Sequence, residues 1–229
     1  MFNIEEIENN LSSIEYMLRL NTDISMEDFG AGNYNTSYYA DLISCDGSTI
    51  ENESYEYIGK LKFNLNHIKK AREQGIDFED YIDDNRPSGF EGIFDPKRFS
   101  LTQAVLDKLQ NPLINEDILI IHELKIFQTY RGLGIADKLI KLIFHHFGNS
   151  CGLIMIDLKP AQFEHRRIMS ETENIKMKYE VFTNDEELAY FKLANHFIKM
   201  GFKHAIGYVF FIETAMMDVK PLDFDLRRL

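Results

Sequence analysis

The chain has 229 residues, with 25 Lys and Arg against 37 Asp and Glu, which gives a formal net charge of −12. A protein that binds nucleic acid through its phosphates needs a surplus of cationic side chains, so this balance argues against a nucleic-acid partner. Its content of 45% hydrophobic and 27% charged residues, with five prolines, is typical of a folded chain that needs no metal or disulfide to hold its core.

Cysteine usage and the absence of sorting signals predict a cytoplasmic protein. Cys45 and Cys151 stand far apart, and neither belongs to a CxxC or Cys/His spacing typical of a metal site. The N-terminus, Met1 to Glu6, lacks the basic and apolar regions of a secretory signal. The longest strongly apolar run, Ile118 to Ile121, is far shorter than the roughly 20 residues that a membrane span requires. We therefore expect no metal and no membrane contact.

The first part of the chain shows two spacings of apolar residues, one typical of a helix and one typical of strands. An amphipathic helix is predicted near the N-terminus from apolar residues at helical spacing, namely Ile4, Ile7, Leu11, Ile14 and Leu18. Residues 38–44 and 55–63 are rich in Tyr and branched apolar residues, and turn-forming residues around Asp46 and Gly47 separate them. This pattern predicts a β-hairpin with a long turn.

The stretch 67–116 does not resemble a sheet. Between Glu73 and Asp95 it carries a net charge of −7, which fits either a solvated acidic loop or an acidic rim that attracts a cationic acceptor. Ser100 to Gln103 fits a capping box that begins a short helix, which Asn111 and Pro112 would end.

The second half is more regular. Residues 118–127 predict a strand, and a turn with Gly132 and Gly134 leads into a helix that ends at Gly148. Residues 153–158 predict a second buried strand, which should lie parallel to the first because a helix connects them. A helix over about 185–200 and a final strand over 208–212 follow.

The glycine turn is the most informative motif. Gly132 and Gly134 can expose consecutive backbone N–H groups at a helix N-terminus, where a phosphate is stabilised, and Arg131 adds a positive charge. A tight turn in any α/β protein could use the same residues. The Walker A and GxGxxG patterns of nucleotide-binding proteins are both absent.

The stretch from Leu124 to Ala136 resembles the acyl-CoA-binding signature of the GNAT superfamily of N-acetyltransferases, because Arg131-x-x-Gly134-x-Ala136 follows a strand. Leu193 to Phe202 resembles the late helix of that family, which ends in Gly-Phe. The resemblance covers about residues 118–212. It leaves the acidic insertion at about 67–116 unmatched, within what we expect to be a single domain over 1–229.

The resemblance implies an α/β fold, the GNAT (acyl-CoA N-acyltransferase) fold, with a central mixed, mostly antiparallel sheet, a splayed parallel pair of strands and flanking helices. It implies transfer of an acetyl group from acetyl-CoA to a primary amine of a small molecule, peptide or protein. The pantetheine arm would lie between the splayed strands, bonded to backbone groups around Ile126 and Gln128. The pyrophosphate would lie on the amides of Arg131, Gly132, Leu133, Gly134, Ile135 and Ala136.

Acetyl transfer requires an amine that arrives as an ammonium to lose a proton. His122 is the first candidate base, because alternation along the strand places it on the face of Leu124 and Ile126. An imidazole with a pKa near 6.5 suits this role at neutral pH; a His packed against the sheet is the alternative. Glu123, of opposite parity, is the second candidate.

The group that protonates the leaving thiolate is less obvious. Phe197 stands where many family members have a Tyr, and it cannot donate a proton. Tyr190, which is nearly on the same helical face, is the candidate, with His196, Tyr208 or water as alternatives. A non-catalytic acyl-CoA-binding module, or a structural domain with an accidental turn, would also fit the sequence. We expect acetyl-CoA and a cationic amine as partners, and a monomer or homodimer.

Overall fold

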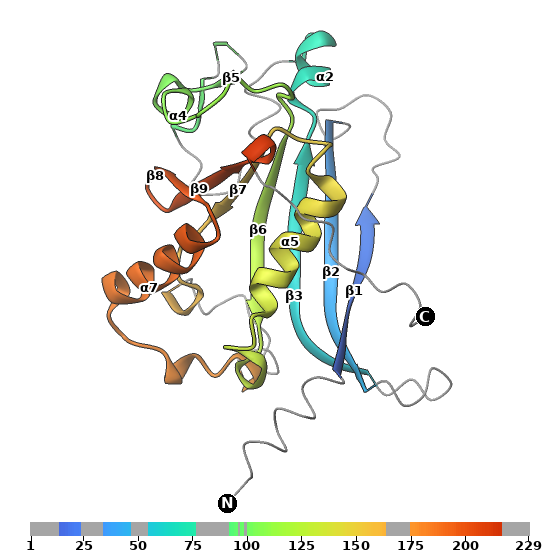
Figure 1. Ribbon diagram of the computed structural model, residues 1–229, viewed down its shortest axis with the longest axis vertical. Coiled ribbons are helices and arrows are strands. Elements are labelled where there is room, and N and C mark those ends of the chain that lie inside the picture. Colours follow the sequence, from blue (N-terminus) through green and yellow to red (C-terminus); the bar gives the residue numbers. More distant parts are fainter. Residues whose placement is uncertain are drawn as a thin grey trace, which may run out of the picture.

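The computed structural model describes residues 14–23, 34–46, 55–76, 92–95, 97–98, 100–163 and 175–216. A seven-stranded sheet in the order β1-β2-β3-β6-β7-β9-β8 runs through them (Figure 1). Its strands are β1 (Ile14–Asp23), β2 (Asn35–Asp46), β3 (Tyr55–Asn66), β6 (Ile118–Ile126), β7 (Leu153–Asp157), β8 (Lys203–Ile206) and β9 (Val209–Glu213). Only β6 and β7 pair in parallel, and the other neighbours are antiparallel. The predicted fold class is confirmed.

The predicted hairpin is confirmed as β2 and β3, which pair from Asn35↔Asn66 to Cys45↔Tyr55. The predicted strands, the helix between them and the late helix are also present, as β6, α5 (Ile135–Phe147), β7 and α7 (Glu186–Lys199). The late helix begins as its sequence suggests, because the Asp185 carboxylate accepts a hydrogen bond from the backbone N–H of Leu188 at 3.0 Å.

The predicted N-terminal helix is wrong where the structure describes it. Ile14 and Leu18 lie in β1, which pairs with β2 along its whole length; the positions before Ile14 lie outside the described residues. Ile14, Tyr16, Leu18 and Leu20 also stand at every second position, although the apolar Met17 interrupts their alternation with polar residues. Because β2 lies beside this segment and hydrogen-bonds to it, the segment forms a strand and not a helix.

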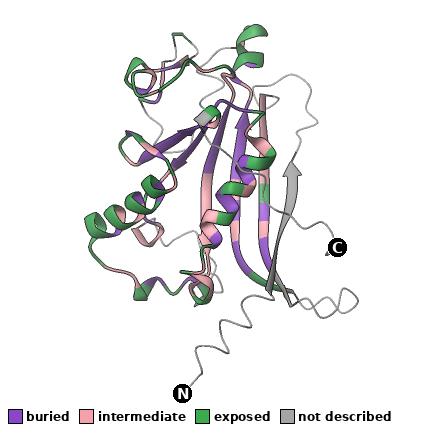
Figure 2. Ribbon diagram, in the orientation of Figure 1, coloured by how far each residue is buried: buried purple, intermediate pink, exposed green. Residues whose placement is uncertain are grey.

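One face of the sheet is covered by α5 and α7 (Figures 1 and 2). The α5 residues Ile140, Ile143 and Phe144 pack there against strand residues that include Phe63 and Ile121. Tyr38 stacks on Phe63 at 4.8 Å between ring centroids and closes one side of this cluster. The apolar stripe of α5 therefore fixes the helix along β6, and its N-terminus lies at the end of that strand.

The other face is covered at one end by α2 (Ile68–Glu73), α4 (Gln103–Leu106) and a small hairpin of β4 (Phe94–Asp95) and β5 (Ser100–Leu101). The predicted capping box is wrong, because Ser100 and Leu101 form β5 and the helix begins only at Gln103. The Thr102 hydroxyl donates to the Gly92 carbonyl at 2.8 Å instead of capping the helix. Most of the predicted acidic stretch between Glu73 and Asp95 lies outside the described residues.

The strand β8 was missed by sequence analysis. Its four residues show little apolar character, and only Ala205 is buried. Pairing with the fully buried strand β9, through a turn at Gly207 with φ of +54°, holds β8 at the sheet edge. A short strand of this kind is defined by its partner and not by its own composition.

Candidate functional site

The strands β6 and β7 separate partway along their length. They pair only from Ile118↔Leu153 to Ile121↔Ile156, whereas β6 continues to Ile126 while paired with β3 (Figure 1). A cavity of about 830 Å³ lies beside the continuing part of β6, and it is lined by both strands, the start of α5, α7 and residues 177–183. The predicted splayed pair of strands is therefore present, and it opens into a cavity.

The backbone of β6 presents polar groups to this cavity. The N–H of Phe127 donates to the Ile58 carbonyl on the β3 side at 2.8 Å. Because successive residues of a strand point their N–H and C=O groups to alternate edges, those of Leu124 and Ile126 point away from β3 and toward the gap. Gln128 has already left the strand and lies in the 3₁₀ turn η2 (Gln128–Tyr130), where its carbonyl accepts from the N–H of Arg131 at 3.3 Å. Leu124 lines the cavity, and the sequence analysis placed it on this strand face without naming it as a binding residue.

The glycine turn forms an open cradle at the start of α5. Gly132 and Gly134 have φ of +81° and +71°, and a Cβ added at either would meet nothing within 4 Å. The first bond of the helix joins the Lys138 N–H to the Gly134 carbonyl at 3.2 Å. The N–H groups of Ile135 and Ala136 therefore have no partner within the helix. Free amides at the positive end of a helix dipole, with space in front of them, suit an anion.

The side chains of the turn divide between this cradle and the core. Ile135 is buried, and Leu133 packs beside it against Leu42 and Ile58. Ile135 can therefore offer a ligand only its backbone, whereas Leu133 is half-buried. Gly132 and Ala136 line the cavity itself.

Arg131 uses most of its guanidinium within the protein. Its Nε donates to the Ile126 carbonyl at 2.8 Å, and one Nη donates to the Met177 carbonyl at 2.8 Å. The guanidinium carbon lies 4.2 Å from the ring centroid of Phe182. Burial lowers the pKa of Arg131, although the guanidinium stays charged at any ordinary pH. The fixed positive charge that we expected is present, but it is anchored between two segments of the chain.

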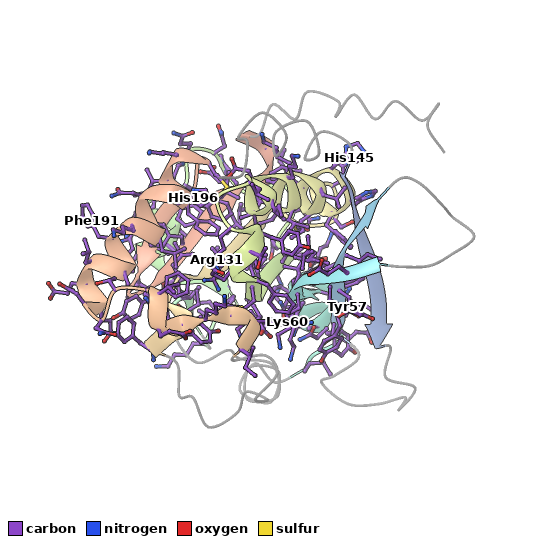
Figure 3. The ribbon with its side chains drawn as sticks, turned by 90° about the horizontal axis from the view of Figure 1, so that it is seen from below. Tyr57, Lys60, Arg131, His145, Phe191 and His196 are labelled. Atoms are coloured by element: carbon purple, nitrogen blue, oxygen red, sulfur yellow. The ribbon has the colours of Figure 1, made fainter. Side chains whose placement is uncertain are left out.

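The cavity reverses the charge balance of the whole chain. Its cationic lining residues are Lys125, Arg131, Lys159 and Lys192, and its acidic ones are Glu123 and Asp157. Two histidines, His122 and His196, line it as well. In the view from below, Arg131 and His196 lie between α7 and α5 (Figure 3). A net positive wall attracts an anionic ligand despite the net charge of −12.

His122 lies at a β-bulge. Ile121 pairs with Phe63 and Glu123 pairs with Lys62, so His122 is the extra residue and the alternation along β6 is interrupted there. Its Nε2 is buried without a hydrogen-bond partner. Burial, aided by the charge of Lys62, lowers the pKa of His122 to about 4. The imidazole is therefore neutral at physiological pH and a weaker base than the ordinary value suggests.

Glu123 faces two lysines. Its Oε1 lies 2.6 Å from Nζ of Lys125 and 3.3 Å from Nζ of Lys60. Glu123 does line the cavity, so the two candidate bases lie side by side.

Tyr190 is not brought into the cavity. Its ring packs edge-on against Tyr208 at 5.0 Å, and its hydroxyl lies 3.5 Å from the Gly207 carbonyl. Its neighbours on α7, His196 and Phe197, line the cavity instead. Phe197 is 3% exposed, so an apolar ring is buried at the position where the resemblance led us to expect a Tyr.

Among the described residues, no group of three or more His, Cys, Asp or Glu side chains could hold a metal ion. The helices of the described ranges are all too short or too polar to span a bilayer.

The sheet order, the diverging parallel pair and the glycine turn before α5 together make this the fold of the GNAT acyltransferases. No family model matches the chain, and no curated protein matches it. Among solved structures it is similar to a Tyr-to-Phe mutant of KacT, with a TM-score of 0.39 and 12% identity over 86% of this chain and 95% of that one.

It is also similar to AtaTR bound with AcCoA, with a TM-score of 0.39 and 10% identity over 89% of this chain and 95% of that one. A third likeness is to a Tyr-to-Phe mutant of the AtaT toxin bound to the C-terminus of the antitoxin AtaR, with a TM-score of 0.38 and 8% identity over 89% of this chain and 94% of that one.

Proposed function

We propose that this protein is an N-acetyltransferase that transfers an acetyl group from acetyl-CoA to a primary amine. One observation carries the proposal: the gap between β6 and β7 leads directly to the open glycine cradle at the N-terminus of α5. A long ligand with an anionic end and an amide-rich arm fits such a groove. CoA has this build, with a diphosphate at one end and a pantetheine arm at the other.

The residues of the groove divide the work of binding. The amides from Gly132 to Ala136 would receive the diphosphate, and the positive lining would attract it from a distance. The backbone N–H and C=O of Leu124 would bond the amides of the pantetheine arm, as a neighbouring strand would. The N–H of Ile126 would do the same, whereas its carbonyl already accepts a hydrogen bond from Arg131. This arrangement directs the thioester toward the bulge at His122.

The chemistry requires a neutral amine. Its nitrogen lone pair attacks the thioester carbonyl carbon, the C–S bond breaks, and the CoA thiolate leaves. Proton transfer from an alkylammonium with a pKa near 10.4 to an imidazole with a pKa of about 4 is uphill by roughly 9 kcal/mol. We infer that the acceptor reacts as the free amine, having lost its ammonium proton to hydroxide or buffer in bulk solution, and that the buried Nε2 of His122 accepts a hydrogen bond that orients it. The proton left on the new amide nitrogen then passes, through water, to the departing thiolate, which leaves as the CoA thiol.

A second candidate function is a non-catalytic acyl-CoA-binding module. The observations that favour it are the buried Phe197 in the position of the proton donor and the low pKa of His122. Both functions need the same groove, and they differ only in whether CoA is released.

Binding and release are tested separately. Acetyl-CoA at 100 times its Kd should raise the free energy of unfolding by about 2.7 kcal/mol. Thiol release is then measured over a mixed panel of polyamines, aminoglycosides, amino acids and basic peptides. Release with an amine supports the acetyltransferase, whereas binding without release over the whole panel supports the module. No stabilisation by acetyl-CoA would refute both.

A matched pair of glycine variants ties binding to the cradle. Gly134→Ala places a Cβ beside the cradle amides, at a residue with φ of +71°. Gly75→Ala places a Cβ at a residue with nearly the same φ, +68°, but after α2 and outside the cradle. Both should cost about 1 kcal/mol of stability through backbone strain. Only Gly134→Ala should weaken acetyl-CoA binding; an equal effect of the two would show that the cradle does not bind it.

A further inference from the structure

Residues 177–183, which we name the wall segment, form the side of the cavity that faces the free edge of β6. The segment contains the 3₁₀ turn η5 (Tyr179–Val181) and joins the start of α7. In Figure 1 it crosses below the gap between the start of α5 and the start of α7. Met177 and Tyr179 are buried, while Val181 is 59% exposed.

The wall segment is held partly by its own turn and partly by contacts with the rest of the protein. Lys178 has φ of +44°, which makes it the sole non-glycine residue with positive φ in the part of the chain that the structure describes. A left-handed residue with a side chain costs free energy and persists only where surrounding contacts enforce it. The segment's own backbone bonds, from the Val181 N–H to the Lys178 carbonyl and from the Phe182 N–H to the Tyr179 carbonyl, both at 3.1 Å, close the turn η5. The contacts that join the segment to β6 come from another residue.

Arg131 supplies them. Its Nε is bonded to the end of β6, at the Ile126 carbonyl, and its Nη to the Met177 carbonyl of the wall segment. The flat face of the guanidinium lies on the Phe182 ring. One side chain thus joins the β6 edge to two points of the wall segment, in the forked and stacked geometry that only arginine offers.

We propose that Arg131 is a positioning residue that holds the wall segment against the thioester arm, and not a ligand of the diphosphate. This inference rests on the proposed function, since it concerns the same groove. The remaining Nη of Arg131 is buried and has no hydrogen-bond partner among the described residues, so the guanidinium presents no exposed donor to the diphosphate. Arg131 therefore acts mainly on the binding of the pantetheine arm, because it positions the wall segment.

The test compares two ligands by calorimetry on the full chain: CoA, and 3′-phosphoadenosine 5′-diphosphate, which has the phosphates of CoA and lacks the arm. Arg131→Gln should weaken the binding of CoA on the order of tenfold, which is the loss of affinity expected for one charge-assisted hydrogen bond. It should change the affinity of the diphosphate less than about twofold. An equal loss for both ligands, or no loss for either, would overturn the proposal.

Two further variants separate position from charge. Arg131→Lys keeps the charge but cannot bridge the two carbonyls, so it should resemble Arg131→Gln; full recovery of CoA affinity would contradict the proposal. Phe182→Ala should cause the same selective loss from the other side of the contact, and its effect should not add to that of Arg131→Gln. Arg98→Gln, whose side chain is 73% exposed and pairs with Asp95, is the control for a lost arginine.

Hydrogen exchange without ligand gives a readout independent of any binding. Amides of the wall segment should exchange on the order of tenfold faster in Arg131→Gln, while those of β7 keep their wild-type rates. Unchanged exchange in the wall segment would refute the positioning role. If wild-type protein fails to bind CoA but the exchange result holds, the proposed function fails and the structural role of Arg131 stands.

Discussion

The buried imidazole of His122 makes a measurable prediction about acid stability. Its pKa is about 4 in the folded protein, because burial and Lys62 disfavour its charged form, and near 6.5 in the unfolded chain. Between these values the unfolded state binds more protons, so the free energy of unfolding falls as the pH falls. The contribution is complete above pH 6.5 and is lost toward pH 4.

The size of this effect follows from the two pKa values. Going from pH 7.5 to pH 5, protonation of the unfolded imidazole should remove about 2 kcal/mol of the free energy of unfolding. His122→Gln removes the titration, so its urea unfolding curves should lose about 2 kcal/mol less over the same interval. Lys141→Gln, on the exposed side of α5, is a control for a substitution that removes a charged surface side chain without touching the buried imidazole. Equal acid dependence in wild type and His122→Gln would refute the assignment of a depressed pKa.

Three other predictions concern the scaffold. Glu213 is 3% exposed, accepts a hydrogen bond from the backbone N–H of Gln110 and pairs with Lys203, and these contacts lower its pKa. Glu213→Gln should therefore lower the free energy of unfolding by about 2 to 3 kcal/mol in urea at pH 7. The difference in stability between variant and wild type should become smaller in acid, where the wild-type carboxylate is protonated. Gly152→Ala would put a Cβ 1.9 Å from the Asn115 carbonyl oxygen, so thermal unfolding should show a loss above about 2 kcal/mol; a wild-type Tm would contradict that close approach. Burial raises the pKa of Cys151 to about 12, so iodoacetamide should modify it at pH 8 only after unfolding, and rapid labelling of the folded protein would disprove its burial.

The sequence predicts the second half of the fold well because its signals are local. A buried strand, two glycines and an apolar helical stripe stand next to one another between Ile118 and Phe147, and each is defined by its own composition. By contrast, β1 depends on pairing with β2, and β8 depends on pairing with β9. Long-range pairing of this kind has no signature within the segment itself.

The candidate site is predictable in its backbone and less so in its side chains. The cradle at Gly132 and Gly134 follows from the motif, since it needs only φ values that glycine adopts. The bulge at His122 arises where β3 and β6 change register, and the low imidazole pKa comes from burial that no spacing reveals. Similarly, the contacts of Arg131 join it to Met177, which lies far along the chain.

The β-bulge at His122 also divides β6 into two parts with different structural surroundings. Up to Ile121, β6 is paired on both edges and carries buried core residues. Beyond His122 it is paired only with β3 among the described residues, and it faces the cavity. Substitutions in the first part should therefore report on folding, and those in the second on ligand affinity. Within the last four residues, Glu123 and Lys125 are the positions at which this division is tested most cleanly, because Leu124 and Ile126 also pack against core clusters.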